Sequence, residues 1–399
     1  MGDYIGWSET EWATQEERLA VDTKSQDLFV GIPLEHEMDE HRVALTPHAV
    51  MALTAKGHRI LVERGAGEAA GFSDHKYSEA GAEIANGPEA VFKAQTVLKV
   101  SPPTQAEIEM MPGNQTLISA LQLRTRNRDY FKALADKNIT ALALEEIRDE
   151  SDHGALRIAM SEIAGRMAAQ IGASLLSGTS PKGKGKLLGA VPGVASSRFV
   201  VIGAGAAGLS AARAAMNTGA QVIIMDESVA RLRYAMELLG DRVITESFRP
   251  KLAMKRLRDA DVAVGAVAPV NGRTPMMVSQ EMVEGMEPGS VIIDISIDQG
   301  GVFETSELTS HDKPTVLKHG VIHYGVPNIA SSVGQTASIA MSNVVAPLLE
   351  SIAEMGGVQE SLKVNLHFRA GLYLYNGLLT KKHLGEFFDL PFSDDVLLF

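Results

Sequence analysis

The sequence carries a glycine pattern that is typical of a dinucleotide-binding loop. Gly203, Gly205 and Gly208 stand at G-x-G-x-x-G spacing, after a β-like run that ends at Ile202 and before an alanine-rich helical run. In such a loop the first glycine allows a tight turn, the second lets the backbone approach a pyrophosphate, and the third lets the helix pack on the strand. The helix N-terminus then binds the phosphates. A phosphate-free α/β turn is the alternative, and the order of strand, turn, helix and strand disfavours it.

An acidic residue ends the second strand of this unit. The β-like run 221–225 is followed by Asp226, whose carboxylate is placed to accept hydrogen bonds from the ribose hydroxyls and to repel a 2′-phosphate. NAD is therefore the expected cofactor. Arg231 follows in the next helical turns, and we expect it to pair with Glu227 or to reach the adenosine ribose. Val267, at the end of a later strand-like run, is a further candidate cofactor-binding residue.

Four polar residues stand in apolar or glycine-rich surroundings and could contact a substrate. Arg42, in HRVALTP, has a fork that suits a carboxylate, although a surface arginine fits the local sequence too. Lys99, inside TVLKV, suits a carbonyl or carboxylate oxygen or a proton transfer, with a snorkelling lysine as the alternative. Asp298 follows the run SVIIDIS at the sheet edge where ligands bind, and is the candidate acid–base or else a turn residue. Asn328, in YGVPNI, holds the nicotinamide or substrate or is a turn asparagine, whereas Asp294 is expected to order backbone.

The composition excludes several classes of protein. The 399 residues include no cysteine, so disulfides and thiolate metal sites are absent, and the histidines show no metal-ligand spacing. The net charge of −12 makes nucleic acid an unlikely partner. We find no targeting signal and no apolar run of ~18 residues that would span a membrane. A cytoplasmic protein with a small-molecule substrate is therefore expected.

Strand-like runs alternate with helical runs, which predicts an α/β fold of two Rossmann-like domains with parallel sheets. Strands of the first domain are expected at 28–33, 58–63, 96–100, 116–121 and 139–144, and strands of the second at 198–202, 221–225, 241–245, 261–267, 290–296 and 320–329. The shorter helices are expected at 48–56, 73–84 and 127–137, and helical fragments at 356–399.

Two long helical runs, at about 155–177 and 335–355, are expected to bridge the domains, and the second is too apolar for a surface. The predicted division is an N-terminal extension (1–27), a discontinuous substrate domain (28–155 plus 335–399) and an NAD-binding domain with its linker helix (156–334). The extension holds Trp7 and Trp12, and either packs on the rest of the chain or a neighbouring subunit, or is a free tail. A lysine-rich loop at 180–194 either steers phosphates or is solvated charge.

Several longer motifs resemble the alanine dehydrogenase family, within the superfamily that includes the soluble nucleotide-binding part of proton-translocating transhydrogenase. The match runs in order over about residues 28–395. The motifs that carry it are VGIPLEHEMDEHRVALTP, ERGAGEAAGF, VLKV, AMSEIAGRMAAQIGA, LLGAVPGV, VVIGAGAAG, IIDISIDQGG and YGVPNIASSV.

The resemblance implies a role for each matching residue. The 2-oxo acid would be held by Arg42 and Lys99, and the proton moved by Asp298. The cofactor would be contacted by Asp226, Ser161, Arg231 and, beside the nicotinamide, Asn328. Family members assemble as hexamers, so a homo-oligomer is expected.

The chain departs from the family at two places near the substrate. The strand end that carries a histidine in the family reads LISALQL here, which puts Gln122 at that position. Glutamine donates a hydrogen bond to a carbonyl but neither relays a proton nor carries charge. The family's K-V-K-E-P is KVSPP here. These changes put the substrate in question more than the fold or the cofactor.

The expected function is NAD-dependent oxidative deamination of L-alanine to pyruvate and ammonia, reversible as reductive amination. The alternatives are the soluble subunit of a split transhydrogenase, an opine-type or saccharopine-type relative that uses another 2-oxo acid, and an NAD-binding homologue with weakened catalysis.

Overall fold

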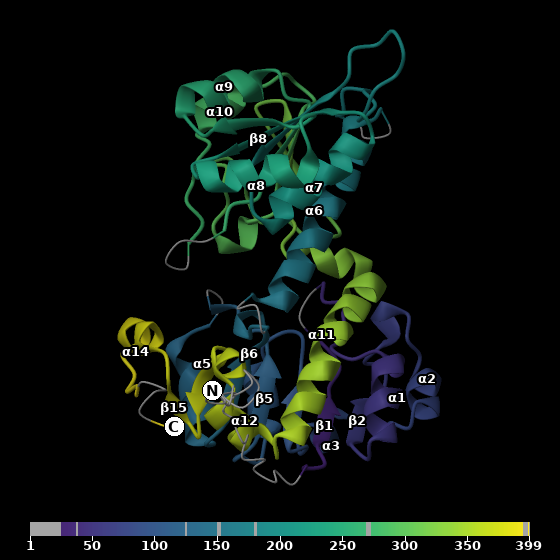
Figure 1. Cartoon of the computed structure of the whole chain (residues 1–399), viewed down its shortest axis with the longest axis vertical. Helices are drawn as coiled ribbons and strands as arrows, with labels where there is room; N and C mark the ends of the chain where they lie inside the picture. Colours follow the sequence, from purple (N-terminus) through teal and green to yellow (C-terminus); the bar gives the residue numbers. More distant parts are fainter. Residues whose placement is uncertain are drawn as a thin grey trace, which may run out of the picture.

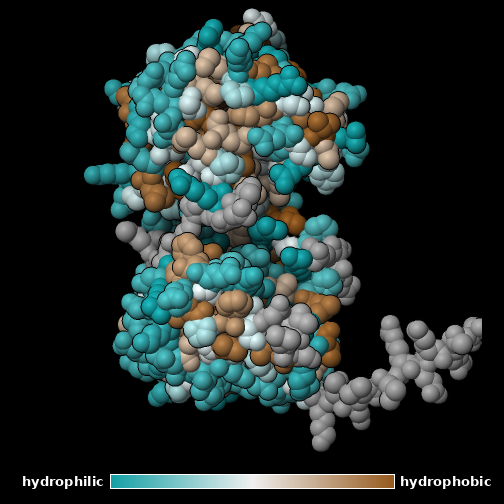
Figure 2. Space-filling model, turned by 90° about the vertical axis from the view of Figure 1, so that its left-hand side faces the viewer, coloured by the Kyte–Doolittle hydropathy of each residue, from teal (hydrophilic) through white to brown (hydrophobic). Residues whose placement is uncertain are grey.

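The computed structural model describes residues 25–36, 39–123, 126–149, 153–178, 182–268, 273–393 and 398. They form two lobes, each built on one sheet, with two long helices where the lobes meet (Figure 1). Both lobes show in the space-filling view, with a narrower waist between them (Figure 2). The N-terminal extension that holds Trp7 and Trp12 lies outside the described residues, except for its last three positions.

The first lobe has a sheet of eight strands within the described ranges. In spatial order they are β15 (Leu378–Leu379), β14 (Leu372–Tyr375), β6 (Thr140–Ala143), β5 (Thr116–Ser119), β4 (Thr96–Leu98), β1 (Phe29–Ile32), β2 (Arg59–Glu63) and β3 (Glu83–Ala85). Its helices are α1 (Pro47–Ala55), α2 (Asp74–Glu79), α3 (Pro88–Val91), α4 (Gln105–Met110), α5 (Arg128–Asp136), α12 (Val358–Val364), α13 (Leu366–Arg369) and α14 (Lys382–Phe388), with 3₁₀ turns η2 (Glu68–Ala70) and η4 (Leu144–Glu146).

Alternation along the strands gives this sheet two apolar faces. Leu98 and its neighbours on one face pack with α1 and with a long helix, whereas Val97 and its neighbours on the other pack with α4 and α5. Because both faces are covered, the strands are short apolar runs, which is why the sequence shows them.

The second lobe has a sheet of seven strands in the described part of the chain. In spatial order they are β12 (Thr315–Lys318), β13 (Val321–Tyr324), β11 (Val291–Asp294), β10 (Val262–Gly265), β7 (Arg198–Ile202), β8 (Gln221–Asp226) and β9 (Ile244–Ser247). Its helices are α7 (Ala206–Asn217), α8 (Val229–Leu239), α9 (Pro250–Arg258) and α10 (Gln280–Glu284), with 3₁₀ turns η5 (Ile297–Gln299) and η6 (Ile329–Val333).

The two long helices, α6 (Ala155–Leu176) and α11 (Gly334–Glu354), cross where the lobes meet (Figure 1). Residues of α6 pack in the core of the second lobe, and residues of α11 pack in the core of the first. In the described part of the chain one segment, Ile329–Glu354, is long and apolar enough to cross a membrane, and 50% of its most apolar window is buried in the protein. A core helix of a soluble protein passes the same test.

The predicted α/β class is confirmed, but some elements were wrongly predicted. The sheets are not purely parallel: β12 pairs antiparallel with β13, and β14 pairs antiparallel with both β6 and β15. The helix predicted at 73–84 ends at Glu79, and β3 follows. The tail at 356–399 contains a hairpin as well as helices, turning at Asn376 and Gly377, which both have positive φ (47° and 81°). An Asn-Gly pair between apolar runs is a strong hairpin signal that the sequence did contain.

Candidate active site

The glycine loop between β7 and α7 has the shape that a bound pyrophosphate requires. Gly203 has φ 106°, and a Cβ there would lie 2.3 Å from the carbonyl oxygen of Ala266. A Cβ on Gly208 would lie 1.9 Å from the carbonyl oxygen of Gly203, so only glycine allows this approach of helix to strand. A Cβ on Gly205 would meet nothing within 4 Å, so space lies open beside the start of α7. The loop therefore fits a dinucleotide phosphate.

Asp226 lies beside this loop at the end of β8 and is buried. Its Oδ2 accepts a hydrogen bond from the backbone N–H of Ala204 (2.8 Å), and its Oδ1 accepts one from Ser228 (2.8 Å). The carboxylate thus ties the glycine loop to the next turn. The predicted pairing of Arg231 with Glu227 is wrong: the ion pair that the described residues show is between Arg231 Nη1 and Asp226 Oδ2, at 3.9 Å.

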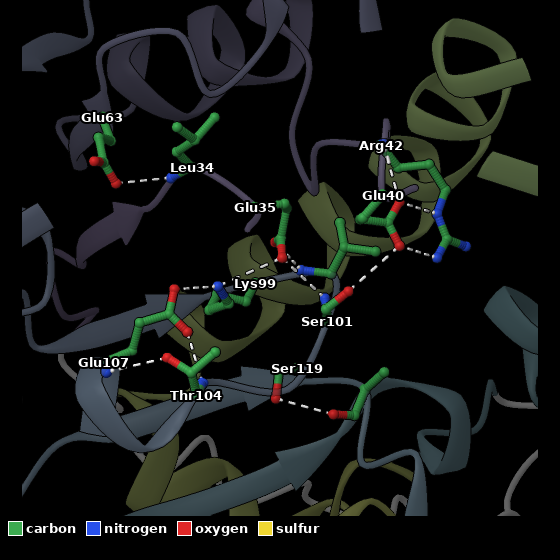
Figure 3. Close-up of polar contacts among 12 residues, drawn as sticks. Leu34, Glu35, Glu40, Arg42, Glu63, Lys99, Ser101, Thr104, Glu107 and Ser119 are labelled. Carbon is green, nitrogen blue, oxygen red and sulfur yellow. Dashed lines mark hydrogen bonds and ion pairs between the residues drawn. The ribbon is translucent and has the colours of Figure 1, made fainter. Parts of the chain in front are cut away.

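Arg42 is not a surface arginine; 8% of it is exposed. Its guanidinium forms two hydrogen bonds with the carboxylate of Glu40: Nε donates to Oε1 (2.7 Å) and Nη2 donates to Oε2 (2.5 Å) (Figure 3). Burial would raise the pKa of Glu40, but the hydrogen bonds and charge of Arg42 hold it below its ordinary value. Glu40 is therefore an ionised partner of Arg42.

Lys99, just after β4, is buried rather than snorkelling, with 1% of it exposed. Its Nζ lies 2.7 Å from Glu107 Oε1 and 3.5 Å from Glu35 Oε2 (Figure 3). Burial would lower the pKa of Lys99, but the two carboxylates together raise it above its ordinary value. The ammonium thus stays charged in the core of the first lobe.

The two carboxylates on Lys99 are held by the ends of neighbouring elements. Glu107 caps α4, since its Oε2 accepts from the backbone N–H of Thr104 (2.7 Å). Glu35 accepts from the backbone N–H groups of Val100 (2.6 Å) and Ser101 (3.3 Å). Burial raises the pKa of Glu35 to about 7, against the opposing effect of Lys99.

Arg42, Lys99 and Asn328 belong to one polar network that spans both lobes. Ser101 links the two cations, because its backbone N–H faces Glu35 and its hydroxyl donates to Glu40 Oε2 (3.4 Å). Asn328, after β13 of the second lobe, donates from Nδ2 to the same Oε2 (2.9 Å). The network places carboxylate-binding groups of the first lobe beside the edge where the second lobe would bind a dinucleotide.

The remaining predicted residues lie on other elements. Ser161 is part-buried on α6, next to Met160, whose Sδ lies 3.5 Å from Arg42 Nη1. Val267 is part-buried beside the glycine loop. Asp298 lies exposed on η5. The turn that carries Asp298 is closed by Asp294, which accepts from the backbone N–H groups of Ser296, Val302 and Phe303, as the sequence predicted.

Gln122 lies exposed after β5 and has a left-handed backbone, with φ 45°. Its backbone N–H and that of Leu121 face Glu145 Oε1, at 3.3 Å and 2.8 Å. Burial raises the pKa of Glu145. A buried carboxyl group thus sets the conformation of the strand end at which the family has its histidine.

Sequence reasoning missed the carboxylates Glu35, Glu40 and Glu107. Signals for them were present: the first two lie in the acidic stretch LEHEMDEHR beside Arg42, and Thr104 with Glu107 forms a T-x-x-E capping box.

In the predicted phosphate-steering loop, Lys184 and Lys186 pair with Asp261 at the start of β10 (3.1 Å and 2.8 Å). That is the sheet edge opposite the glycine loop, which argues against phosphate steering. Among the described residues, no group of three or more His, Asp or Glu side chains could hold a metal ion.

Comparison with known proteins identifies the family. The model of the N-terminal domain of alanine dehydrogenase/PNT matches residues 31–164, and the model of the C-terminal domain matches residues 168–382. The chain belongs to the alanine dehydrogenase/PNT family. It is 42% identical over 355 residues to an alanine dehydrogenase of Bacillus subtilis, covering 88% of this chain and 93% of that protein. It is 39% identical over 368 residues to an alanine dehydrogenase of Methanococcus maripaludis, covering 92% and 98%.

Solved structures agree with this family. An L-alanine dehydrogenase superposes with a TM-score of 0.85 at 35% identity, covering 90% of this chain and 99% of that one. A transhydrogenase from Sinorhizobium meliloti superposes with a TM-score of 0.75 at 24% identity, covering 88% and 99%, which shows the shared fold alone. The resemblance and the fold predicted from the sequence are confirmed.

Proposed function

We propose that this protein catalyses the reversible oxidative deamination of L-alanine to pyruvate and ammonia with NAD. The predicted enzyme class, an NAD-dependent amino-acid dehydrogenase, and its cofactor are confirmed by the family to which the chain belongs. The observation that carries the reaction is the buried network of Arg42, Lys99 and Asn328, which joins carboxylate-binding cations to the dinucleotide lobe. A 2-oxo acid needs such cations, because its carboxylate must lose water to reach the cofactor.

Each predicted catalytic residue, within the network or outside it, has a role that its chemistry supports. Arg42 holds the substrate carboxylate, and Lys99 polarises the carbonyl oxygen. Asp298, on the exposed η5 turn, moves the protons as the imine forms and hydrolyses, since an exposed carboxylate exchanges protons with water. Gln122 at most orients the carbonyl oxygen. NAD, when bound, accepts the hydride from the substrate Cα.

The cofactor contacts follow from the geometry of the second lobe. Gly203, Gly205 and Gly208 receive the pyrophosphate, Asp226 takes the adenosine ribose, and Arg231 lies beside that ribose. Nearer the reacting end we place Val267, Ser161 and Asn328. The supporting observation is that the glycine loop, Asp226 and Val267 lie at one edge of the sheet.

We also propose the division of the chain into an N-terminal extension, a discontinuous substrate domain and an NAD-binding domain with its linker helix. The sheets support it, because β14 and β15 from the end of the chain join the strands of the first lobe. By family resemblance we propose a cytoplasmic homohexamer without a membrane or nucleic-acid partner.

A second candidate is a related enzyme that reduces an imine of another 2-oxo acid. It is favoured by Gln122 and by the sequence KVSPP, which both differ from the family near the substrate. A split transhydrogenase subunit would require a second nucleotide-binding chain, and a weakened homologue would bind NAD without turnover.

The experiment is a spectrophotometric scan of NADH oxidation over 2-oxo acids, with ammonium and with larger amines. Pyruvate with ammonium should be turned over by the chain alone. Arg42→Ala should lower kcat/KM for pyruvate by about 10- to 100-fold, since a charge-assisted hydrogen bond contributes about 1.5–3 kcal/mol. Its affinity for NADH should change little. Arg59→Ala is the matched control, because this exposed arginine pairs with Glu83 on the surface of the same lobe. Turnover only with another oxo acid or amine would assign the second candidate.

A further inference from the structure

Glu40 occupies one edge of the Arg42 guanidinium and leaves the other to a weak partner. The carboxylate of Glu40 takes the edge formed by Nε and Nη2, and it also accepts from the backbone N–H of Arg42 (3.0 Å). On the opposite side, Nη1 faces Met160 Sδ at 3.5 Å. A thioether is a weak acceptor, so a substrate carboxylate is a much better partner for that side. Glu40 thus holds the guanidinium in one orientation and leaves its Nη1 side without a strong hydrogen-bond partner.

Glu40 also connects Arg42 to the second lobe. Oε2 of Glu40 accepts from Arg42 Nη2 and from Asn328 Nδ2 at the same time. Asn328 has a left-handed backbone, with φ 56°, a conformation that asparagine tolerates better than most residues. Its side chain is therefore aimed by the turn that follows β13. Only a carboxylate, with acceptor sites on both oxygens and no donor, satisfies all these donors together.

The backbone around Arg42 is fixed by serines of the segment that follows Asn328. His41 N–H donates to Ser331 Oγ (2.8 Å), and Val43 N–H donates to Ser338 Oγ (2.9 Å). Asn328 and these serines belong to one continuous segment. A shift of that segment would therefore move Arg42 through the backbone hydrogen bonds and through Glu40.

We propose that Glu40 is a positioning residue: it turns the Nη1 side of Arg42 toward the substrate carboxylate and couples that orientation to Asn328 in the second lobe. This rests on the proposed function, in which Arg42 holds the carboxylate. Glu40 touches neither substrate nor cofactor in this scheme. It sets the angle at which the oxo acid meets the nicotinamide, and such angles decide the rate of hydride transfer.

The kinetic test compares Glu40→Gln with Glu63→Gln. Glutamine keeps one acceptor oxygen but turns an NH₂ group toward Arg42 or Asn328, so one donor loses its partner. Glu40→Gln should lower kcat/KM for pyruvate about tenfold or more, with the Kd for NADH within twofold of wild type. Glu63 is a matched control: it is a buried carboxylate of the same lobe that accepts from the backbone N–H of Leu34 (2.8 Å), and glutamine retains that acceptor. Unchanged kinetics in Glu40→Gln would overturn the proposal.

The coupling to Asn328 is tested by a double variant. Asn328→Ala should raise the KM for pyruvate at saturating NADH in the wild-type background. In the Glu40→Ala background, which removes both acceptor oxygens, it should raise KM no further, because the link is already broken. Effects on KM that multiply would show that Asn328 does not act through Glu40.

A readout without turnover separates this proposal from the proposed function. Phenylglyoxal modifies arginine, and mass spectrometry gives the rate at Arg42 alone. That rate should rise severalfold in Glu40→Gln and stay at the wild-type value in Glu63→Gln. An unchanged rate at Arg42 would refute the positioning role. If wild type turned over no 2-oxo acid while the rate still rose, the proposed function would fail and the hold of Glu40 on Arg42 would stand.

Discussion

Glu35 makes the stability of the first lobe fall as pH rises, and Glu35→Gln should remove that dependence. Burial raises the pKa of this carboxyl to about 7, from 4.5 in an exposed glutamate, although Lys99 and two backbone N–H groups oppose the shift. The folded chain therefore keeps a proton on Glu35 at pH values where the unfolded chain has lost it. By linkage, stability declines wherever the folded state binds more protons.

The size of the effect follows from the two pKa values. Each pH unit between 4.5 and about 7 is worth about 1.4 kcal/mol, which gives about 3 kcal/mol in total. Most of this, about 2–3 kcal/mol, is lost between pH 5 and pH 8. Well below pH 4.5 Glu35 is protonated in both states and contributes no pH dependence.

The assay is the free energy of unfolding of wild type and Glu35→Gln, from urea titrations at pH 5, 6, 7 and 8. Other titrating groups, such as Asp294 with a pKa raised by burial to about 6, are present in both proteins and cancel in the difference. Glutamine loses one of the hydrogen bonds to Val100 and Ser101, which adds a constant cost. The difference between variant and wild type should therefore move in favour of the variant by about 2–3 kcal/mol from pH 5 to pH 8. A difference that is flat with pH, or that moves in favour of wild type, would show that Lys99 keeps Glu35 ionised.

Three further outcomes test the proposed site. NAD should bind more tightly than NADP, since the buried carboxylate of Asp226 repels a 2′-phosphate, and equal affinities in fluorescence titrations would contradict this. Asp298→Asn should lower kcat by about 10²–10⁴-fold with an unchanged circular dichroism spectrum. A loss below about fivefold, with chemistry shown to be rate-limiting, would move the proton role to Lys99 or water. Gln122→His should raise alanine turnover and add a titration near pH ~6.5 if the pocket accepts pyruvate, and histidine tolerates the left-handed backbone found there. An enzyme with ordinary alanine activity that is indifferent to both Gln122→His and Gln122→Ala would make this position a bystander.

The central strands could be predicted from the sequence because they are buried on both faces and therefore apolar throughout. Two edge strands could not: β12 is only partly buried, and β3 has three residues with a glutamate at its start. Such strands are defined by pairing with a distant segment, which local patterning does not show. The hairpin at Asn376 and Gly377 is the exception, because its Asn-Gly turn can be recognised from the local sequence alone.

The candidate site divides in the same way. Lys99 stood out because a cation within an apolar stretch is unusual, and Arg42 because its fork suits a carboxylate. The partners of these cations could not be predicted in the same way. Glu107 contacts Lys99 from a helix cap, and Asn328 contacts Glu40 although the two lie 288 positions apart in the chain. Contacts of that separation depend on how the two lobes are placed, and no local pattern carries that information.

Burial of the two cations explains why the carboxylates accompany them. Desolvation of a buried cation costs several kcal/mol: an isolated ammonium tends to lose its proton, whereas a guanidinium stays charged and bears the cost. Glu35 and Glu107 keep Lys99 charged, and Glu40 replaces part of the hydration that Arg42 loses on burial. Burial raises the pKa of Glu35 to about 7, and the nearby charge of Glu40 adds to the shift, whereas Lys99 opposes it. In the proposed site a substrate carboxylate would add a further negative charge to this cluster, so its binding would favour a proton on Glu35.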